Sequence, residues 1–174
     1  MNFILVKKRF TVFLVISSIV NAQNNYEKGN KYLNNGDLTN ALIEFSAGII
    51  KNPYDWKLYQ ARAYTNEQSQ NFEEALNDAN KALELNPRQF NLSSLFTRGR
   101  ILLKKGDYVK AIEDFSYLIQ YFPNDFQNKI GIFHLNRAKS YLYSNQKNNA
   151  CIDFLESRKR KMSDAQHFID KFCN

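Results

Sequence analysis

Apolar residues recur along the chain at the spacing of one face of an α-helix. After each of three short polar turns, apolar side chains occupy positions i, i+3, i+4 and i+7, which places them on a single helical stripe. Amphipathic helices with one buried face are therefore predicted in these three segments. The stripes are Leu38, Ala41, Leu42 and Phe45; Phe72, Ala75, Leu76 and Ala79; and Tyr108, Ala111, Ile112 and Phe115.

Small residues occur in pairs, and the pairs repeat. Each pair occupies positions i and i+12, and the pairs recur along the chain at steps of 34, 36 and 39. A period of this length is typical of helical repeats. Two antiparallel helices approach closely where their side chains are small, so each pair predicts the crossing point of a helical hairpin. The pairs are Gly29 and Ala41, Ala63 and Ala75, Gly99 and Ala111, and Ala138 and Ala150.

Turn residues and prolines delimit the predicted helices. Gly36-Asp37 and Gly106-Asp107 separate the two helices of a hairpin, and prolines end three of the second helices. A ninth helix is expected after Ser163, because Gln166 three residues later gives the spacing of a capping box. The preceding eight helices are predicted at residues 24–35, 38–51, 55–69, 72–85, 89–105, 108–121, 127–144 and 147–160.

The repeated unit resembles the tetratricopeptide repeat. The resemblance covers nearly all of the chain after Ala22, with departures such as Asn66 in the place of Tyr32. It implies an all-α fold, a right-handed α-solenoid of four hairpins with a capping helix, at about 22–55, 56–89, 90–125, 127–161 and 163–173. It also implies protein–protein interaction and no enzymatic activity. The residues that carry it in the first unit are Gly29, Tyr32, Gly36, Ala41, Phe45 and Pro53.

The N-terminal segment 1–22 differs from the repeats. Three cations, Lys7 to Arg9, precede an uncharged apolar run from Phe10 to Val20, and small or apolar residues lead up to Ala22. This order is typical of a signal peptide, and the run is too short for a membrane-spanning helix. We expect cleavage after Ala22, an exported domain at 23–174 in the periplasm or outside the cell, and no remaining transmembrane segment. An uncleaved anchor is the alternative.

Charge and motifs point away from catalysis and from nucleic acid. Removal of the segment 1–22 lowers the formal net charge from +7 to +4, and the run at 158–161 reads as a solvated helix end. His134 and His167 lack metal-ligand spacing, so neither a metal nor a cofactor is expected. Acidic residues of the second helices are expected on solvated faces: Glu73, Glu74, Asp78, Glu113 and Asp114.

Cys151 and Cys173 have two possible roles. Cys151 occupies the position of Leu42 and Leu76 in earlier units, which fits a small buried apolar residue. An oxidising compartment would permit the two cysteines to pair. The C-terminal stretch also resembles that of exported tetratricopeptide proteins of Bacteroidetes-type bacteria, and that resemblance implies a disulfide.

The first helices line the concave face in this repeat family, so their remaining positions predict a groove. Cations and aromatic rings alternate there, which suits a protein or peptide partner that is acidic or aromatic-rich. A merely solvated surface is the alternative, and Leu135 is also placed in the groove. The predicted partner-binding residues are Tyr26, Asn30, Tyr64, Phe96, Arg100, Lys104, Lys139 and Tyr143.

One known binding mode of the family does not fit. Tetratricopeptide co-chaperones hold a C-terminal carboxylate with two lysines, two asparagines and an arginine, and this chain keeps one of the five. The corresponding residues are Tyr26, Asn30, Ala61, Ser93 and Thr97. The leading hypothesis is therefore an exported interaction module with another kind of ligand, and the second is a structural subunit of a cell-envelope assembly.

Overall fold

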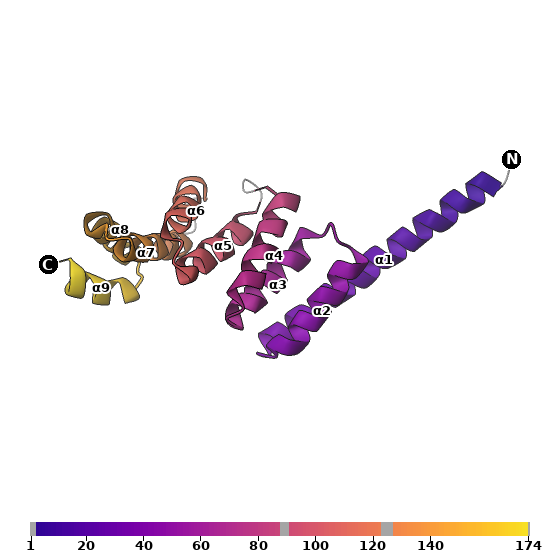
Figure 1. Cartoon of the computed structure of the whole chain (residues 1–174), viewed down its shortest axis with the longest axis horizontal. Coiled ribbons are helices and arrows are strands. Elements are labelled where there is room, and N and C mark those ends of the chain that lie inside the picture. The colour runs from indigo at the N-terminus through magenta and orange to yellow at the C-terminus, as the bar shows by residue number, and fades with distance from the viewer. Residues whose placement is uncertain (1–2, 88–90, 123–126, 174) are drawn as a thin grey trace. The chain divides into compact units, whose positions relative to one another are not determined.

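Helical hairpins account for the chain in the computed structural model (Figure 1). The structure describes the backbone of residues 3–87, 91–122 and 127–173, and the side chains of these residues except 3–18, 127 and 128. Within that described backbone there are nine helices and no strand. The chain divides into two units, residues 1–85 and 86–174, which are described one at a time.

The first unit contains two hairpins. Helix α1 (Phe3–Asn34) pairs with α2 (Leu38–Lys51), and α3 (Trp56–Gln68) pairs with α4 (Phe72–Leu85). Helix α2 also packs on α3, so the two hairpins stack. The bounds of α2 and α4 coincide with the predicted ones.

The second unit repeats this arrangement and adds one helix. Helix α5 (Leu92–Lys105) pairs with α6 (Tyr108–Tyr121), and α7 (Gln127–Tyr143) pairs with α8 (Lys147–Lys159). Helix α6 packs on α7, and α9 (Asp164–Phe172) packs on α8. Prediction and structure agree on both bounds of α6, whereas residues 89 and 90 of the predicted fifth helix lie outside the described residues.

The paired small residues lie where the helices of each hairpin meet. Ala41, Ala75 and Ala111 are completely buried. A side chain at Gly99 would place its Cβ 2.9 Å from the ring of Phe115, so the two helices could not keep this separation. The crossing-point interpretation of the sequence is thus supported by the packing.

Left-handed backbone closes the turn inside every hairpin. Gly36 and Gly106 have φ of 78° and 85° and occupy this position in the first and third hairpins. Gln70 and Asn145, both with φ of 62°, take their place in the second and fourth. Glycine adopts this conformation without a steric penalty, whereas a glutamine does not.

Helix capping follows the sequence at some ends and departs from it at α9. The side chains of Asp37 and Asp107 accept hydrogen bonds from the backbone N–H groups of residues three positions later, as N-caps do. Ser163 makes no such bond, since its backbone is itself helical with φ −57° and ψ −37°. The predicted capping box at Ser163 is therefore wrong.

Helix α1 continues through the expected cleavage site. Ala22 is buried against Ala41 and Phe45 of α2. One turn later, Asn25 donates a hydrogen bond to Glu44 and accepts one from Lys51. Among the described residues, no helix has the length and apolar character needed to cross a membrane. Cleavage after Ala22 stays a prediction.

Arginine–aspartate ion pairs tie the two helices of the second, third and fourth hairpins. In each pair the arginine lies on the first helix and the aspartate, at position i+16, on the second. Asp78 and Asp114 are 6% and 1% exposed, so the expectation that they are solvated is wrong. Glu73, Glu74 and Glu113 are exposed as expected. The pairs are Arg62–Asp78 (2.8 Å), Arg98–Asp114 (2.6 Å) and Arg137–Asp153 (2.6 Å).

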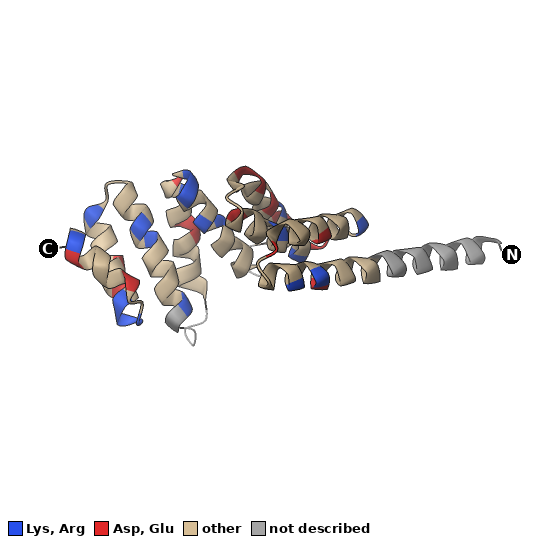
Figure 2. Ribbon diagram, turned by 90° about the horizontal axis from the view of Figure 1, so that it is seen from below, with Lys and Arg blue, Asp and Glu red and all other residues tan. Residues whose placement is uncertain are grey.

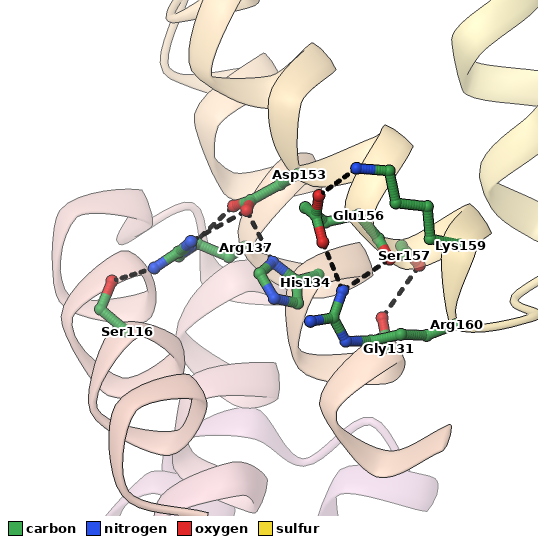
Figure 3. A network of polar contacts seen from close by, with 9 residues as sticks. All are labelled: Ser116, Gly131, His134, Arg137, Asp153, Glu156, Ser157, Lys159 and Arg160. Carbon is green, nitrogen blue, oxygen red and sulfur yellow. Dashed lines mark hydrogen bonds and ion pairs between the residues drawn. The ribbon is translucent and has the colours of Figure 1, made fainter. Parts of the chain in front are cut away.

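Two of these arginines also reach the neighbouring hairpin of their own unit. Arg62 donates a hydrogen bond to Ser46 Oγ on α2 at 3.0 Å. Arg137 donates one to Ser116 Oγ on α6, also at 3.0 Å (Figure 3). One guanidinium thus joins three helices. Each of the three pairs is made by two hydrogen bonds, from Nε and from one terminal nitrogen of the guanidinium, which is the arrangement that suits a carboxylate.

Candidate functional site

A surface pocket of about 420 Å³ lies in the second unit. It gathers residues from α5, α6 and α7, and four of the predicted partner-binding residues meet there: Arg100, Lys104, Lys139 and Tyr143. The remaining lining residues are Leu103, Tyr108 and Asn136.

Helical periodicity explains why these residues converge. Arg100 and Lys104 are four residues apart on α5, so their side chains extend from the same face one turn apart. Asn136, Lys139 and Tyr143 are spaced by three and four residues on α7 and form a matching row. The pocket lies between these two rows.

The pocket is positively charged. Its described lining includes three cations and no Asp or Glu. Arg100 lies over the ring of Phe96, with the guanidinium carbon 5.5 Å from the ring centroid. Burial lowers the pKa of Lys139, and the nearby negative charge of Asp164 opposes that shift. The second unit also carries Lys and Arg on the helices next to the C-terminus (Figure 2).

Two aromatic rings border the cations. Tyr108 of α6 and Tyr143 of α7 have ring centroids 5.8 Å apart, and Tyr143 is 53% exposed. Sequence reasoning placed Tyr108 in the buried stripe and left out Asn136. The position of Asn136, three residues before Lys139 on the same helix, is the signal that could have identified it.

The other predicted binding residues of the second unit belong largely to the core. Phe96 is half-buried, with ring centroids 6.2 Å from Phe115 and 5.1 Å from Phe133. Leu135 is 7% exposed and packs with Ala138, so its placement in the groove was wrong. Apolar residues on a first helix can therefore face either the groove or the hairpin partner.

In the first unit, the predicted residues do not share a described pocket. Tyr26 packs beside Phe45, with ring centroids 6.2 Å apart, and Asn30 is half-buried. Tyr64 is 38% exposed. A separate pocket of about 410 Å³ in this unit is lined by the Arg62–Asp78 ion pair and by Leu42, Ser46, Asn66, Glu74 and Asn77.

The cysteines lie at bonding distance. The Sγ atoms of Cys151 and Cys173 are 2.03 Å apart, and their Cα atoms 5.5 Å apart. This geometry agrees with the predicted disulfide. It connects the beginning of α8 to the residue that follows α9.

The buried His134 and Asp153 contact each other and hold α7 against α8. His134 Nδ1 lies 2.7 Å from a carboxylate oxygen of Asp153 (Figure 3). In the part of the chain that the structure describes, no three histidine, cysteine or acidic side chains are grouped as a metal site would require. Burial raises the pKa of Asp153, but hydrogen bonds from Arg137 and His134 outweigh it and lower the pKa below the usual range.

The basic run at the end of α8 is partly neutralised within the helix. Lys159 and Arg160 form ion pairs with Glu156 and lower its pKa to about 2 (Figure 3). Ser157 donates a hydrogen bond to the carbonyl oxygen of Gly131, which fixes the end of α8 against α7. Lys159 and Arg160 of this run therefore contribute to the local structure at the end of α8.

Sequence comparisons identify two repeats. Models described as tetratricopeptide repeat match residues 57–89 and 93–125. The mitochondrial import receptor subunit TOM70 of Mus musculus is 33% identical over 106 residues, which cover 58% of this chain and 17% of the receptor. The Hsp70-Hsp90 organizing protein of Triticum aestivum is 30% identical over 100 residues, covering 57% and 17%. The chain thus matches about one sixth of the length of these relatives.

Solved structures share the fold. MamA superposes with a TM-score of 0.72 at 16% identity, covering 84% of this chain and 81% of MamA. The TPR2B domain of yeast Sti1, in a complex with pHsp70, gives 0.62 at 22% identity, covering 71% and 98%. The first TPR domain of Spaghetti (RPAP3), bound to the HSP90 peptide SRMEEVD, gives 0.59 at 26%, covering 66% and 91%. The fold is an all-α solenoid, and residues 57–89 and 93–125 match models of the tetratricopeptide repeat.

Proposed function

We propose that the chain is a protein-interaction module whose second unit binds an acidic segment of a peptide or protein. The observation that carries this proposal is the convergence of Arg100, Lys104 and Lys139 with two tyrosine rings in one pocket whose described lining contains no acid. Carboxylates would form charge-assisted hydrogen bonds with these cations, and apolar parts of the ligand would pack on Tyr108 and Tyr143.

The related structures support a peptide ligand in general terms. The yeast Sti1 and RPAP3 domains are described in complexes with Hsp70 and an HSP90 peptide. The binding residues of the present chain differ from the co-chaperone clamp, as the mismatches at Tyr26, Ala61 and Ser93 indicate. The ligand we propose is therefore acidic but is not selected by that clamp.

A pair of charge-matched variants tests the pocket. Replacing Arg100 and Lys104 together by glutamine should weaken binding of an acidic peptide by about 1 to 3 kcal/mol, the scale of hydrogen bonds to charged groups. Replacing Lys28 and Lys31 by glutamine removes the same charge from exposed positions of α1 and should change the affinity little. Fluorescence anisotropy gives the affinities, and circular dichroism reports helix content.

Two results would contradict the pocket assignment. One is an equal loss of affinity in both double variants, which would indicate attraction by net charge alone. The other is full affinity in the Arg100 and Lys104 variant together with a loss on changing exposed residues of the second helices, such as Val109 and Ile152. Binding would then use the opposite helices.

We also propose that the module acts outside the cytoplasm after removal of residues 1–22. The proposal rests on Lys7 to Arg9 followed by the uncharged run from Phe10 to Val20. N-terminal sequencing of the exported protein should begin at Gln23. Recovery of intact Met1 from an extracytoplasmic fraction would indicate an anchor instead.

The second candidate function is a structural subunit of a cell-envelope assembly. It is supported by large exposed side chains outside the pocket, among them Tyr54 (80% exposed) and Tyr121 (56%). A complex that survives size-exclusion chromatography of envelope extract, and that the Arg100 and Lys104 variant retains, would favour this candidate over a peptide ligand.

A further inference from the structure

Lys139 belongs both to the pocket and to the surroundings of α9. It lines the pocket, and its Nζ lies 5.2 Å from the ring centroid of Phe168, a residue of α9. Phe168 in turn stacks on the buried Phe154 of α8, with ring centroids 4.8 Å apart and planes inclined by 9°. Lys139 is thus connected through one ring to the core below α9.

Helix α9 is held by buried residues along its length and by a disulfide after its last turn. Ala165 and Ile169 are buried in the same cluster as Leu135. After the last turn, Cys173 is joined to Cys151 at the beginning of α8. The face of α9 that carries Phe168 therefore has a defined position relative to α7, from which Lys139 extends.

We propose that α9 is part of the ligand site and is not only a cap: Phe168, held in place by the Cys151–Cys173 bond, is a positioning residue that keeps the Lys139 ammonium at the pocket. The proposal rests on the proposed function, because it assigns α9 a role in binding the same acidic ligand.

The physical basis is the attraction of a cation to the face of an aromatic ring. An ammonium over a ring loses part of its hydration and part of its side-chain freedom before a ligand arrives, so less remains to be lost on binding. Lys139 is half-buried, and the charges identified near it are Asp164 on α9 and the pocket cations Arg100 and Lys104. Without the ring, the lysine could turn outward into water.

Affinity measurements on the full chain test this role. The probes are a glutamate-rich peptide and its glutamine analogue. Phe168→Leu keeps an apolar side chain but removes the ring, and should weaken binding of the glutamate peptide roughly two- to fivefold. Phe168→Tyr keeps the ring and should restore the affinity. Trp56→Leu is the matched control, because it also removes a ring that lies near a lysine, Lys57, but in the first unit.

A double-mutant cycle separates positioning from general damage. In a Lys139→Gln background, Phe168→Leu should have no further effect, because the group through which it acts is gone. Replacing Cys151 and Cys173 together by serine should weaken binding in the same way, again without effect in the Lys139→Gln background. A loss of equal size in that background would overturn the proposal.

A second measurement needs no ligand. The side-chain ¹³Cε resonance of Lys139 reports its titration. Phe168→Leu should raise the lysine pKa toward its ordinary value, because a lysine that the ring no longer holds turns into water and escapes the burial that lowers its pKa. An unchanged Lys139 titration in Phe168→Leu would overturn the positioning role. A wild-type chain that binds neither peptide, with a Lys139 titration that does shift in Phe168→Leu, would overturn the proposed function alone.

Discussion

The two units of the chain share a scaffold but differ at the positions that line the pocket of the second. In register, Arg100 and Lys104 of α5 correspond to Asn30 and Asn34 of α1, and Lys139 of α7 corresponds to Tyr64 of α3. The first unit thus has uncharged residues at the three positions where the second unit has cations. The residues that fold the repeat recur, whereas the residues proposed to bind a partner do not, which is why recurrence alone identifies the fold and not the ligand.

The most damaging test of the shared scaffold is a charge at its crossing points. Ala75→Asp in the first unit and Ala111→Asp in the second would each bury an unpaired carboxylate at a fully buried position. We expect a loss of more than about 4 kcal/mol in the free energy of unfolding for each variant. Urea unfolding followed by circular dichroism measures this loss.

Peptide binding adds a distinction between the units. Ala75 belongs to the first unit and the residues that line the pocket belong to the second, so Ala75→Asp should mainly unfold the first unit and leave the affinity of the pocket within a few-fold. Ala111→Asp should abolish binding. The matched controls Ala75→Ser and Ala111→Ser should retain both helix content and binding. If Ala75→Asp also abolished binding, the two units would fold as one.

A medium effect is expected from the ion pairs that both units contain. Asp153→Asn removes the partner of Arg137 and His134, whereas Asp78→Asn removes the partner of the more exposed Arg62. We expect the free energy of unfolding to fall by about 3 kcal/mol in Asp153→Asn and by about 2 kcal/mol in Asp78→Asn. Breaking a buried pair leaves a charge uncompensated, and solvent reduces this cost at Arg62. Equal losses in urea unfolding would contradict this ranking.

The same pair predicts a pH dependence. The pKa of Asp153 is lower in the folded chain than the usual value of about 3.9. Its contribution to stability is therefore complete above about pH 4 and is lost as the pH falls through the lower folded pKa. The stability of Asp153→Asn should fall less steeply below pH 4 than that of the unaltered chain. Parallel curves would show that the carboxylate contributes nothing through its ionisation.

The sequence predicted the scaffold well because its signals are local and repeat. The helix bounds of α2, α4 and α6 follow from apolar periodicity together with the turn residues between them. The charge pattern of a single helix does not predict the ion pairs, because on its own helix each aspartate is one charge on the polar face. The constant interval from Arg62 to Asp78 and from Arg98 to Asp114 was the available signal.

The candidate site was less predictable for physical reasons. Arg100, Lys104 and Lys139 could be grouped from the register, since cationic side chains are rarely fully buried unless they are paired. Leu135 could not be assigned in this way, because an apolar side chain on a first helix can face either the groove or the second helix of its hairpin. The contact between Lys139 and Phe168 depends on the exact position of α9, which no repeat specifies.

The smallest expected effect on stability concerns the turns inside the hairpins, which have the same left-handed backbone in both units. The first hairpin of each unit has glycine at the left-handed position, and the second has Gln70 or Asn145. Gln70→Gly should raise the free energy of unfolding by about 0.5 to 1 kcal/mol, because relief of the left-handed strain outweighs the added entropy of the unfolded chain.

Asn145→Gly should raise the stability less, since asparagine tolerates this conformation better than glutamine does. The reverse change, Gly36→Ala, should lower stability by about 1 kcal/mol through backbone strain alone, as no described atom beyond Gly36 and its two chain neighbours lies within 4 Å of where its Cβ would be. Thermal unfolding of the three variants under identical conditions gives the order. A loss of stability in both Gln70→Gly and Gly36→Ala would contradict this account. The side chain of Gln70 would then stabilise the folded chain by more than its left-handed backbone costs, and the turns of the two hairpins would not be equivalent.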